Sequence, residues 1–390
     1  MPSFLPAIDA IQWRALFHVK LSELEISGVR NLSAVSINNF SEINIFSGPN
    51  GAGKTSILED IHILGLARSF RGTQLQPVIQ YHQDTCTVFG KVLHDDQSAL
   101  AVGVKRAKRG GFRIRIGGQD EKSLIRLAET LPIQLIDSSA YTLLEGGPKQ
   151  RRQFMDWGVF HVEHSFYDSW RRMQRCLKQR NATLRSGKAN KRTLSAWDQE
   201  LIEASEQVNK ARMLYFESFY PVFVGFLERL VDLPGLSVSY SRGWDTDKSL
   251  SDVLASSIDR DLRRGFTHYG PHRADIKLQI NGLNAGQVLS RGQQKLVVCA
   301  LRLAQCDLMV KTTQKKCVLL IDDLPAEIDA SHQGKLCTLL DSLDIQLFMT
   351  CVVADDLVNQ PWEKLKSLKV FQVLKGETEE TLSLDMAAER

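Results

Sequence analysis

A glycine-rich stretch followed by a lysine and a threonine carries the clearest chemistry in this chain. Residues 48–55 read Gly-Pro-Asn-Gly-Ala-Gly-Lys-Thr, which fits the pattern G-x-x-x-x-G-K-[ST]. Glycines let the backbone wrap closely, so that successive N–H groups point at phosphate oxygens. We expect Lys54 to reach the β and γ phosphates of ATP and the Thr55 hydroxyl to coordinate Mg²⁺. The residues expected to contact the nucleotide here are Gly48, Pro49, Asn50, Gly51, Ala52, Gly53, Lys54, Thr55 and Ser56.

A pair of aspartates at the end of an apolar run could supply the second half of this site. Residues 318–321 read Val-Leu-Leu-Ile, typical of a strand covered on both faces, and Asp322 and Asp323 follow. We assign Mg²⁺ binding, through water, to Asp322. Asp323 would polarise an attacking water. Aspartate is one methylene shorter than glutamate, and a displacement of about 1 Å can cost on the order of a hundredfold in rate, so slow hydrolysis is predicted.

A second loop, far along the chain, resembles the signature loop of the ATP-binding-cassette superfamily. Residues 289–293 read Leu-Ser-Arg-Gly-Gln, in which Ser290 could cap a helix and Gln293 complete a capping box. The positive end of that helix could bind a γ phosphate, with contacts from Ser290, Gly292 and Gln293. Taken alone, the pattern also fits an ordinary capped helix. In the superfamily this loop serves a second subunit's ATP, so the resemblance implies an ATP-dependent homodimer.

The same superfamily resemblance suggests three more elements of the site. Gln134, in Leu-Pro-Ile-Gln-Leu, is a candidate for the glutamine that senses Mg²⁺, although any exposed glutamine after a proline would look similar. Where the superfamily commonly has a histidine after a strand, this chain has Thr350, which would have to contact the γ phosphate. Residues 326–329 resemble the loop that crosses the dimer interface. The catalytic candidates are therefore Asp323, Lys54 and Gln134, and the metal candidates Thr55, Asp322 and Gln134.

The order of predicted elements indicates an α/β fold built from both ends of the chain. Strands are expected at 24–26 and 43–46, before the glycine-rich loop, and a helix over 56–64 after it. Residues 85–116 alternate in polarity, and Gly110-Gly111 is predicted to turn a hairpin between two basic strands. Further strands are expected at 236–240, 276–280, 318–321 and 345–349, with a helix over 295–308.

The central part of the chain has a helical period instead. Long amphipathic helices are predicted over 166–180 and 197–219, the second ended by Pro221. We therefore expect a P-loop ATPase lobe with mixed sheets, like the heads of ABC and SMC ATPases, and an inserted, mostly α-helical second lobe. The expected divisions are an N-terminal extension (1–20), the first part of the ATPase lobe (21–130), the helical lobe with the signature loop (131–295) and the rest of the ATPase lobe (296–390).

Composition narrows the class of protein. No run of eighteen apolar residues is present, so no membrane span is expected. Seven cysteines form no CxxC pair, which favours buried free thiols in a reducing cytoplasm. The net charge is only +4, but basic residues crowd into 105–115 and 171–192.

These basic runs are compatible with nucleic-acid contact, although a solvated face is the more common explanation. Few aromatic residues interleave with them, which favours sequence-independent contacts with the DNA backbone at duplexes or duplex–single-strand junctions. The candidate DNA contacts are Lys105, Arg106, Lys108, Arg109, Arg171, Arg172, Arg175 and Lys178.

From about residue 21 onward the chain resembles the RecF family of bacterial recombination mediators. The resemblance lies in Ser69-Phe70-Arg71, in residues 146–157, 177–181, 269–275 and 289–295, in the paired aspartates and in the missing histidine. It implies a slow, DNA-stimulated ATPase that dimerises with ATP on DNA. It also implies work with RecO and RecR to load RecA at single-strand gaps, in DNA repair, replication and the SOS response. The extension before residue 20 and Leu324-Pro325 depart from the family pattern.

Other classes of ATPase fit less well. A transporter subunit would carry a compact insert, whereas about 240 residues separate Lys54 from Ser290 here. An SMC-like chromosome-associated ATPase head would need longer heptad arms than residues 131–230 provide. A DNA-binding protein without nucleotide control would not be expected to keep Lys54, Thr55 and Asp322.

Overall fold

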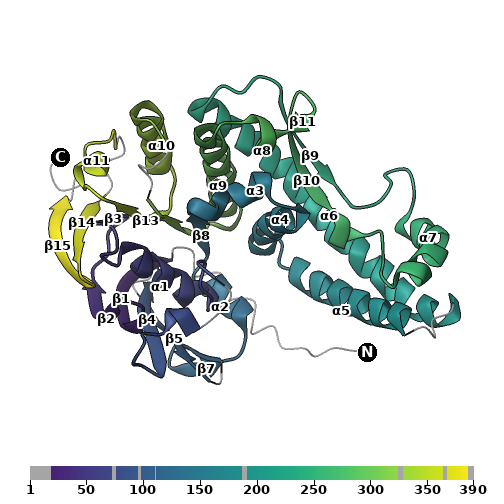
Figure 1. Ribbon diagram of the computed structural model, residues 1–390, viewed down its shortest axis with the longest axis horizontal. Helices are drawn as coiled ribbons and strands as arrows, with labels where there is room; N and C mark the ends of the chain where they lie inside the picture. The colour runs from purple at the N-terminus through teal and green to yellow at the C-terminus, as the bar shows by residue number, and fades with distance from the viewer. Residues whose placement is uncertain are drawn as a thin grey trace, which may run out of the picture. The chain divides into compact units, whose positions relative to one another are not determined.

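The structure of the chain, a computed structural model, describes residues 19–72, 76–94, 98–109, 111–186, 191–323, 328–362 and 367–384. The chain divides into two compact units, one of Met1–Ser139 with Cys306–Arg390 and one of Ala140–Gln305. Each unit is described by itself (Figure 1). Most of the expected N-terminal extension lies outside the described residues.

A six-stranded sheet in the first unit draws on both ends of the chain. Its order is β15-β14-β3-β13-β12-β8, and the neighbours from β14 to β8 are parallel. The carboxyl ends of these parallel strands therefore share one edge of the sheet. The strands are β3 (Ile43–Ser47), β8 (Ile133–Ile136), β12 (Val318–Ile321), β13 (Gln346–Cys351), β14 (Leu368–Leu374) and β15 (Glu377–Leu384).

The position of β8 corrects the predicted lobe boundaries. The helical lobe is predicted to begin at residue 131 and to end at 295. β8 instead pairs in parallel with β12, Ile136 beside Ile321, so it belongs to the first unit. Its four residues are too few to carry a period that separates a strand from a helix turn. The second boundary falls within α9 (Arg291–Thr313), between residues 305 and 306.

An antiparallel sheet makes up the other half of the first unit, in the order β2-β1-β4-β5-β6-β7. Helix α1 (Lys54–Leu66) contacts strands of both sheets, and nearly all of its side chains are buried. An apolar cluster that spans both sheets and α1 forms the core of this unit. The strands are β1 (Lys20–Val29), β2 (Leu32–Asn38), β4 (Thr85–Leu93), β5 (Ala99–Ala107), β6 (Phe112–Ile116) and β7 (Gln119–Glu121).

The α/β fold and the expected strand–loop–helix context of the glycine-rich loop are confirmed. β5 and β6 form the expected hairpin, although Gly110 lies outside the described residues. The shorter helices of this unit, with one at its boundary, are η1 (Gln76–Val78), α2 (Leu124–Thr130), η2 (Ser138–Tyr141), α10 (Ala330–Ser342) and α11 (Asp355–Val358).

The second unit is mostly helical and carries a small sheet of order β11-β10-β9. Its helices α5 and α6 lie side by side (Figure 1). Its elements are α3 (Thr142–Glu145), α4 (Pro148–Val162), α5 (Phe166–Arg185), α6 (Lys191–Leu230), β9 (Leu236–Ser241), α7 (Leu250–Arg264), η3 (Pro271–Arg273), β10 (Asp275–Ile280), β11 (Leu283–Asn284) and α8 (Ala285–Val288).

The prediction that Pro221 ends a helix is wrong, because Pro221 lies inside α6. Proline removes one backbone hydrogen bond, but the buried face of the helix continues past it. Phe219 and Phe223, on either side of the proline, are each 1% exposed, and their rings stack at 6.0 Å. Packing of this aromatic face offsets the lost hydrogen bond.

Two stretches that carry the family resemblance in this unit are joined by an ion pair, and a third supplies a fully buried arginine. Arg151, from residues 146–157, binds both carboxylate oxygens of Asp275, from residues 269–275, at 2.7 and 3.0 Å. Arg180, from residues 177–181, is fully buried and binds Asp198 and Asp261 at 2.6 and 2.7 Å. Arg151 and Arg180 therefore connect separate segments of the second unit.

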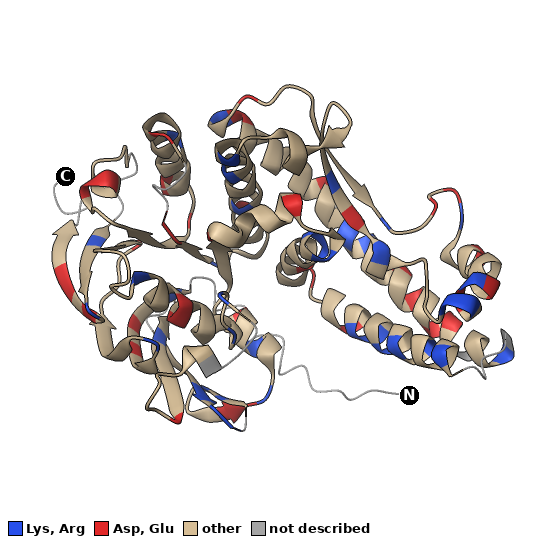
Figure 2. Cartoon of the chain, viewed as in Figure 1, with Lys and Arg blue, Asp and Glu red and all other residues tan. Residues whose placement is uncertain are grey.

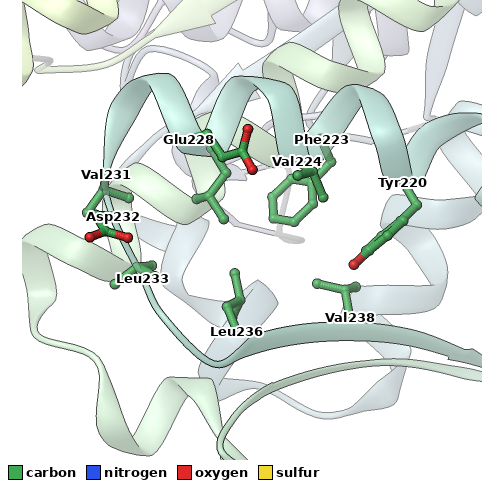
Figure 3. A pocket seen from close by; sticks show the side chains of 10 residues that line it. Tyr220, Phe223, Val224, Glu228, Val231, Asp232, Leu233, Leu236 and Val238 are labelled. Carbon is green, nitrogen blue, oxygen red and sulfur yellow. The ribbon is translucent and has the colours of Figure 1, made fainter.

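A cavity of about 320 Å³ lies in the second unit between the end of α6 and β9 (Figure 3). Most of the residues that line it are apolar, and two carboxylates, Glu228 and Asp232, lie among them. The apolar lining is Phe223, Val224, Leu227, Val231, Leu233, Leu236 and Val238, with Tyr220 at one end. None of these residues belongs to the glycine-rich loop or the signature loop.

All seven cysteines are buried, which confirms the expected burial of these thiols. Within the described ranges, no helix combines the length and the hydrophobicity that crossing a membrane requires.

Candidate functional site

The glycine-rich loop turns from β3 into α1 at positions that only glycine fits. Gly48 has φ 145°, and a Cβ there would lie 2.3 Å from the Val373 carbonyl oxygen. Gly53, the N-cap of α1, has φ 120°, and a Cβ there would lie 2.9 Å from Leu32. Both values of φ lie where side chains are strained. The loop can therefore follow this path closely against β14 and β2.

A cavity of about 350 Å³ opens beside this loop. Its lining joins the loop to the aspartate pair, as the sequence predicted, and adds residues that the sequence analysis missed. Gly48, Pro49 and Ala52 are not among the residues that line it. The lining is Arg30, Asn31, Asn50, Gly51, Gly53, Lys54, Thr55, Ser56, Arg71, Asp322, Asp323 and Thr350.

Lys54 and Thr55 lie at the start of α1, where helix geometry and the loop place them together. The Lys54 Nζ donates to the carbonyl oxygens of Gly48 and Pro49 at 2.6 and 3.0 Å. The Thr55 hydroxyl donates to Asp322 Oδ1 at 3.0 Å. A hydroxyl and a carboxylate at this distance are the hard oxygen donors that Mg²⁺ prefers, so the donor set fits that ion.

Thr350 links the two aspartates. Its hydroxyl donates to Asp322 Oδ1 at 2.8 Å and accepts from the backbone N–H of Asp323 at 2.7 Å. The backbone N–H of Asp322 donates to the Ile136 carbonyl oxygen of β8 at 2.9 Å. The neighbouring strands β8 and β13 therefore hold the pair from both sides.

The structure does not bring Gln134 to this cavity, which corrects that prediction. Gln134 is 2% exposed and lies beside Leu319 within the sheet. Asp322 is three residues further along, about 10 Å at the rise of a strand. Ile136, the last residue of β8, accepts the backbone hydrogen bond from Asp322, and Asp137 follows it directly. The sequence misled because the extent of β8 was unknown.

Two arginines of the cavity share one buried carboxylate of α1. Glu59 is fully buried and binds Arg30 through both oxygens, with 2.8 Å between Nη2 and Oε1. This hydrogen bond raises the pKa of Arg30. The Arg71 Nη1 lies 4.0 Å from Glu59, and the Ser69 hydroxyl donates to Glu59 at 2.5 Å.

The sequence held only a partial signal for these cations. Ser69-Phe70-Arg71 belongs to the stretches that resemble the family, but its sequence alone predicts no role for Arg71. Arg30 lies in the turn between β1 and β2 at φ 46°, and nothing in its neighbours along the chain points to the glycine-rich loop.

The signature loop lies in the second unit and forms the predicted capping box. The backbone N–H of Gln293 donates to the Ser290 hydroxyl at 3.3 Å, and the Ser290 N–H donates to Gln293 Oε1 at 3.0 Å. Ser290 is exposed, and Gly292 is partly so. Arg291 is bound to Glu145 at 2.7 Å, so its charge is partly neutralised.

Comparison with known proteins gives the family. The family model described as RecF/RecN/SMC N terminal domain matches residues 20–378. A protein of Stutzerimonas stutzeri (strain A1501), named DNA replication and repair protein RecF, is 50% identical over 359 residues, covering 92% of this chain and 97% of that protein. One of the same name from Pseudomonas paraeruginosa (strain DSM 24068 / PA7) is 48% identical, with 95% and 100% covered. The chain belongs to the RecF family.

Solved structures agree at the level of fold. A structure described as the recombination mediator protein RecF with ATP in the RecFOR pathway has a TM-score of 0.81 and 22% identity, covering 95% of this chain and 100% of that one. An Smc head domain from Pyrococcus furiosus has a TM-score of 0.59 and 14% identity, covering 95% and 97%. The fold is thus that of RecF and of SMC heads.

The first set of predicted DNA contacts in this RecF-family chain needs one correction. Arg106 is 2% exposed, because β5 alternates and turns this side chain inward. Burial lowers its pKa. Lys105, Lys108 and Arg109 are exposed, and the Lys108 Nζ donates to the Tyr81 carbonyl oxygen at 2.9 Å.

The second set lies on α5, where basic residues recur along the helix (Figure 2). Arg172 and Arg175 are paired with acids of α6, with 2.8 Å between Arg175 and Glu200. Arg171 and Lys178 are exposed. These two therefore remain the better candidates for a phosphate contact. Of the loop expected to cross the dimer interface, Ala326 and Glu327 lie outside the described residues, and Asp329 caps α10.

Proposed function

We propose that this chain is an ATP-dependent DNA-binding protein of recombinational DNA repair and replication, in which ATP drives dimerisation and slow hydrolysis reverses it. The observation that carries the ATP part is the cavity that joins the glycine-rich loop to the aspartate pair, with Thr55 bound to Asp322 at 3.0 Å. The repair part rests on membership of the RecF family and on its relatives' names.

Most residues of the cavity have a defined task in this proposal. Lys54 and the backbone of residues 48–56 would bind the phosphates, and Arg30 and Arg71 would add positive charge. Thr55 and Asp322 would hold Mg²⁺, which supplies charge neutralisation at the phosphates. Asp323 would orient the attacking water and accept its proton.

The signature loop extends the proposal to a dimer. The exposed Ser290 caps α9, and the positive N-terminal end of this helix could bind an anion. In a homodimer, Ser290, Gly292 and Gln293 of one copy would bind the γ phosphate of the other copy's ATP. We further propose RecO and RecR as partners and RecA loading in the SOS response as the outcome, in the cytoplasm, by analogy with the family.

The SMC-like alternative is less well supported. The relatives named RecF cover nearly the whole chain at about half identity, whereas the Smc head matches at 14%.

Sizing the protein with and without ATP and Mg²⁺ tests the proposal. We expect a monomer without ATP and a dimer with it. Lys54→Ala should lose ATP binding and therefore dimerisation. Ser290→Arg should bind ATP normally but stay monomeric, because the larger cation would block the other copy's phosphate.

A matched control distinguishes a block of the shared phosphate site from simple loss of a helix cap. Ser249 is an exposed N-cap of α7, and its hydroxyl accepts from the Asp252 N–H at 3.1 Å. Ser249→Arg removes a cap of the same kind and should still dimerise. If Ser290→Arg dimerises as wild type does, the shared-ATP proposal is wrong.

Turnover tests the role of Asp323. Asp323→Asn should keep the ATP-driven dimer and lower hydrolysis on the order of a hundredfold, since the amide cannot accept the proton. Phosphate release measured on the isolated dimer would show this. Normal hydrolysis by Asp323→Asn would remove this residue from the catalytic role.

A further inference from the structure

We propose that Thr350 is a positioning residue, which holds the two aspartates in register with one another, and that it does not bind the γ phosphate. The proposal rests on the proposed ATPase function. It gives a role to the position where the wider superfamily commonly has a histidine.

The register of the sheet places Thr350 next to the aspartate pair. β13 lies between β12 and β3, the strands that lead into the aspartates and into the glycine-rich loop. Met349 pairs with Ile321, so the residues that follow, Thr350 and Asp322, lie side by side at the edge of the sheet. Thr350 is 1% exposed.

The hydrogen bonds of Thr350 leave it no proton for a phosphate. A threonine hydroxyl has one proton to donate and can accept from other donors. Its proton goes to Asp322 Oδ1 at 2.8 Å, and its oxygen accepts from the Asp323 N–H at 2.7 Å. Ionised phosphate oxygens only accept hydrogen bonds. A direct contact with the γ phosphate would therefore break the bond to Asp322.

The two bonds act on the two aspartates in different ways. At Asp322 the hydroxyl orients the carboxylate. Thr55 donates to the same oxygen, but its hydroxyl is the expected Mg²⁺ ligand. When Mg²⁺ binds Thr55, the hydroxyl of Thr350 would still orient Asp322. At Asp323 it holds the backbone of a residue with φ 53°, a left-handed conformation that is uncommon outside glycine.

One hydroxyl thus links the metal carboxylate of Asp322 to the backbone of Asp323, the residue that would orient water. Such partners of metal ligands typically change metal affinity or activity by about 10- to 100-fold when removed.

The test replaces the hydroxyl without changing the shape. Thr350→Val keeps the branched side chain and should lower kcat and the affinity for the metal by about 10- to 100-fold each. Metal affinity is measured with Mn²⁺ by electron paramagnetic resonance in the presence of ADP, independently of hydrolysis. Thr350→Ser keeps the hydroxyl and should return both quantities to within about threefold of wild type.

Nucleotide binding in EDTA distinguishes the two roles of Thr350. A positioning residue leaves the affinities for ATP and ADP unchanged when no metal is present. A contact with the γ phosphate would weaken ATP relative to ADP in Thr350→Val, and that result, or unchanged metal affinity, would overturn the proposal.

Two controls keep the result interpretable. Ser205→Ala removes another fully buried hydroxyl, in α6, and should change neither kcat nor Mn²⁺ affinity. Thr350→Ala serves as a second variant if valine prevents folding, since it is smaller than threonine. If wild type neither binds nor hydrolyses ATP, the proposed function fails. If wild type does both and Thr350→Val matches it, only the role of Thr350 fails.

Discussion

The two units use their charged residues differently. In the first unit, Lys54 and the aspartate pair line an open cavity, with Asp322 and Asp323 directly after the end of β12, where a ligand could reach them. In the second unit, Arg180 and Arg212 lie inside the packing and are bound to aspartates. Arg180 and Arg212 are 0% and 2% exposed. The charged groups of the cavity are therefore placed for chemistry, whereas these two arginines are placed to hold the second unit together.

The difference matters because the stability of a protein falls sharply when one partner of a buried ion pair is removed. Taking two charges out of water is costly, and their attraction offsets this only while both partners are present. Arg212 binds both oxygens of Asp156 and also the Pro271 carbonyl oxygen at 2.7 Å, so that one side chain connects α6, α4 and η3. Loss of one partner should be felt across the second unit and little in the first.

The largest expected effect is from Arg180→Met. It leaves the fully buried Asp261 without its arginine and should lower the free energy of unfolding of the second unit by about 3–5 kcal/mol. ATP affinity should stay within about twofold of wild type. Urea titration followed by hydrogen exchange and mass spectrometry reports each unit separately.

Arg175→Met is the matched control for this change. Arg175 lies on the same helix and also pairs with an acid, but its side chain is 64% exposed. An exposed pair contributes about 1 kcal/mol or less. If both substitutions destabilise equally, or if Arg180→Met destabilises the first unit as much as the second, the contrast between the units is wrong.

The next largest expected difference between the units is how their stability responds to acid. Burial lowers the pKa of His62 in the first unit and of His272 in the second, each to about 4 from an ordinary 6.5. Between these values the unfolded chain binds more protons, so stability falls as the pH falls from 6.5 toward 4. The loss is about 2 kcal/mol per histidine between pH 7.5 and pH 5.

In the first unit a carboxyl group opposes this loss. Burial raises the pKa of Asp60 well above its usual range, so its folded form binds the extra proton and gains stability as the pH falls. Hydrogen exchange at pH 7.5 and pH 5 should therefore show the second unit weakening more. Asp60→Asn removes the opposing group and should make the first unit equally sensitive. His272→Gln should flatten the response of the second unit. If Asp60→Asn changes nothing, Asp60 does not oppose the loss.

The contrast also explains what the sequence could and could not predict. The glycine-rich loop is contiguous, and the aspartates follow a short apolar strand, so local pattern was enough for both. The prediction for Gln134 failed because it depends on the register of β8 in the sheet. The prediction for Arg106 failed because it depends on which face of β5 points inward. The prediction for Pro221 failed because packing of α6 continues past the proline. Arg30 could not be found, because only the fold brings its turn to the loop.

The smallest expected effect concerns DNA. Substitution of Arg171 and Lys178 by alanine should lower affinity for a duplex–single-strand junction and reduce the slope of log K against log salt by up to about 0.9 for each phosphate contact. The matched pair, Arg172→Ala with Arg175→Ala, removes the same charge. These two are already bound to Glu200 and Glu203, so little of their charge is available to a phosphate.

An equal effect of both pairs on the salt slope would mean that DNA binding depends only on the net charge of α5. No change from either pair would place the DNA contact elsewhere, and the exposed Lys105 and Arg109 of the first unit would then be the next to test.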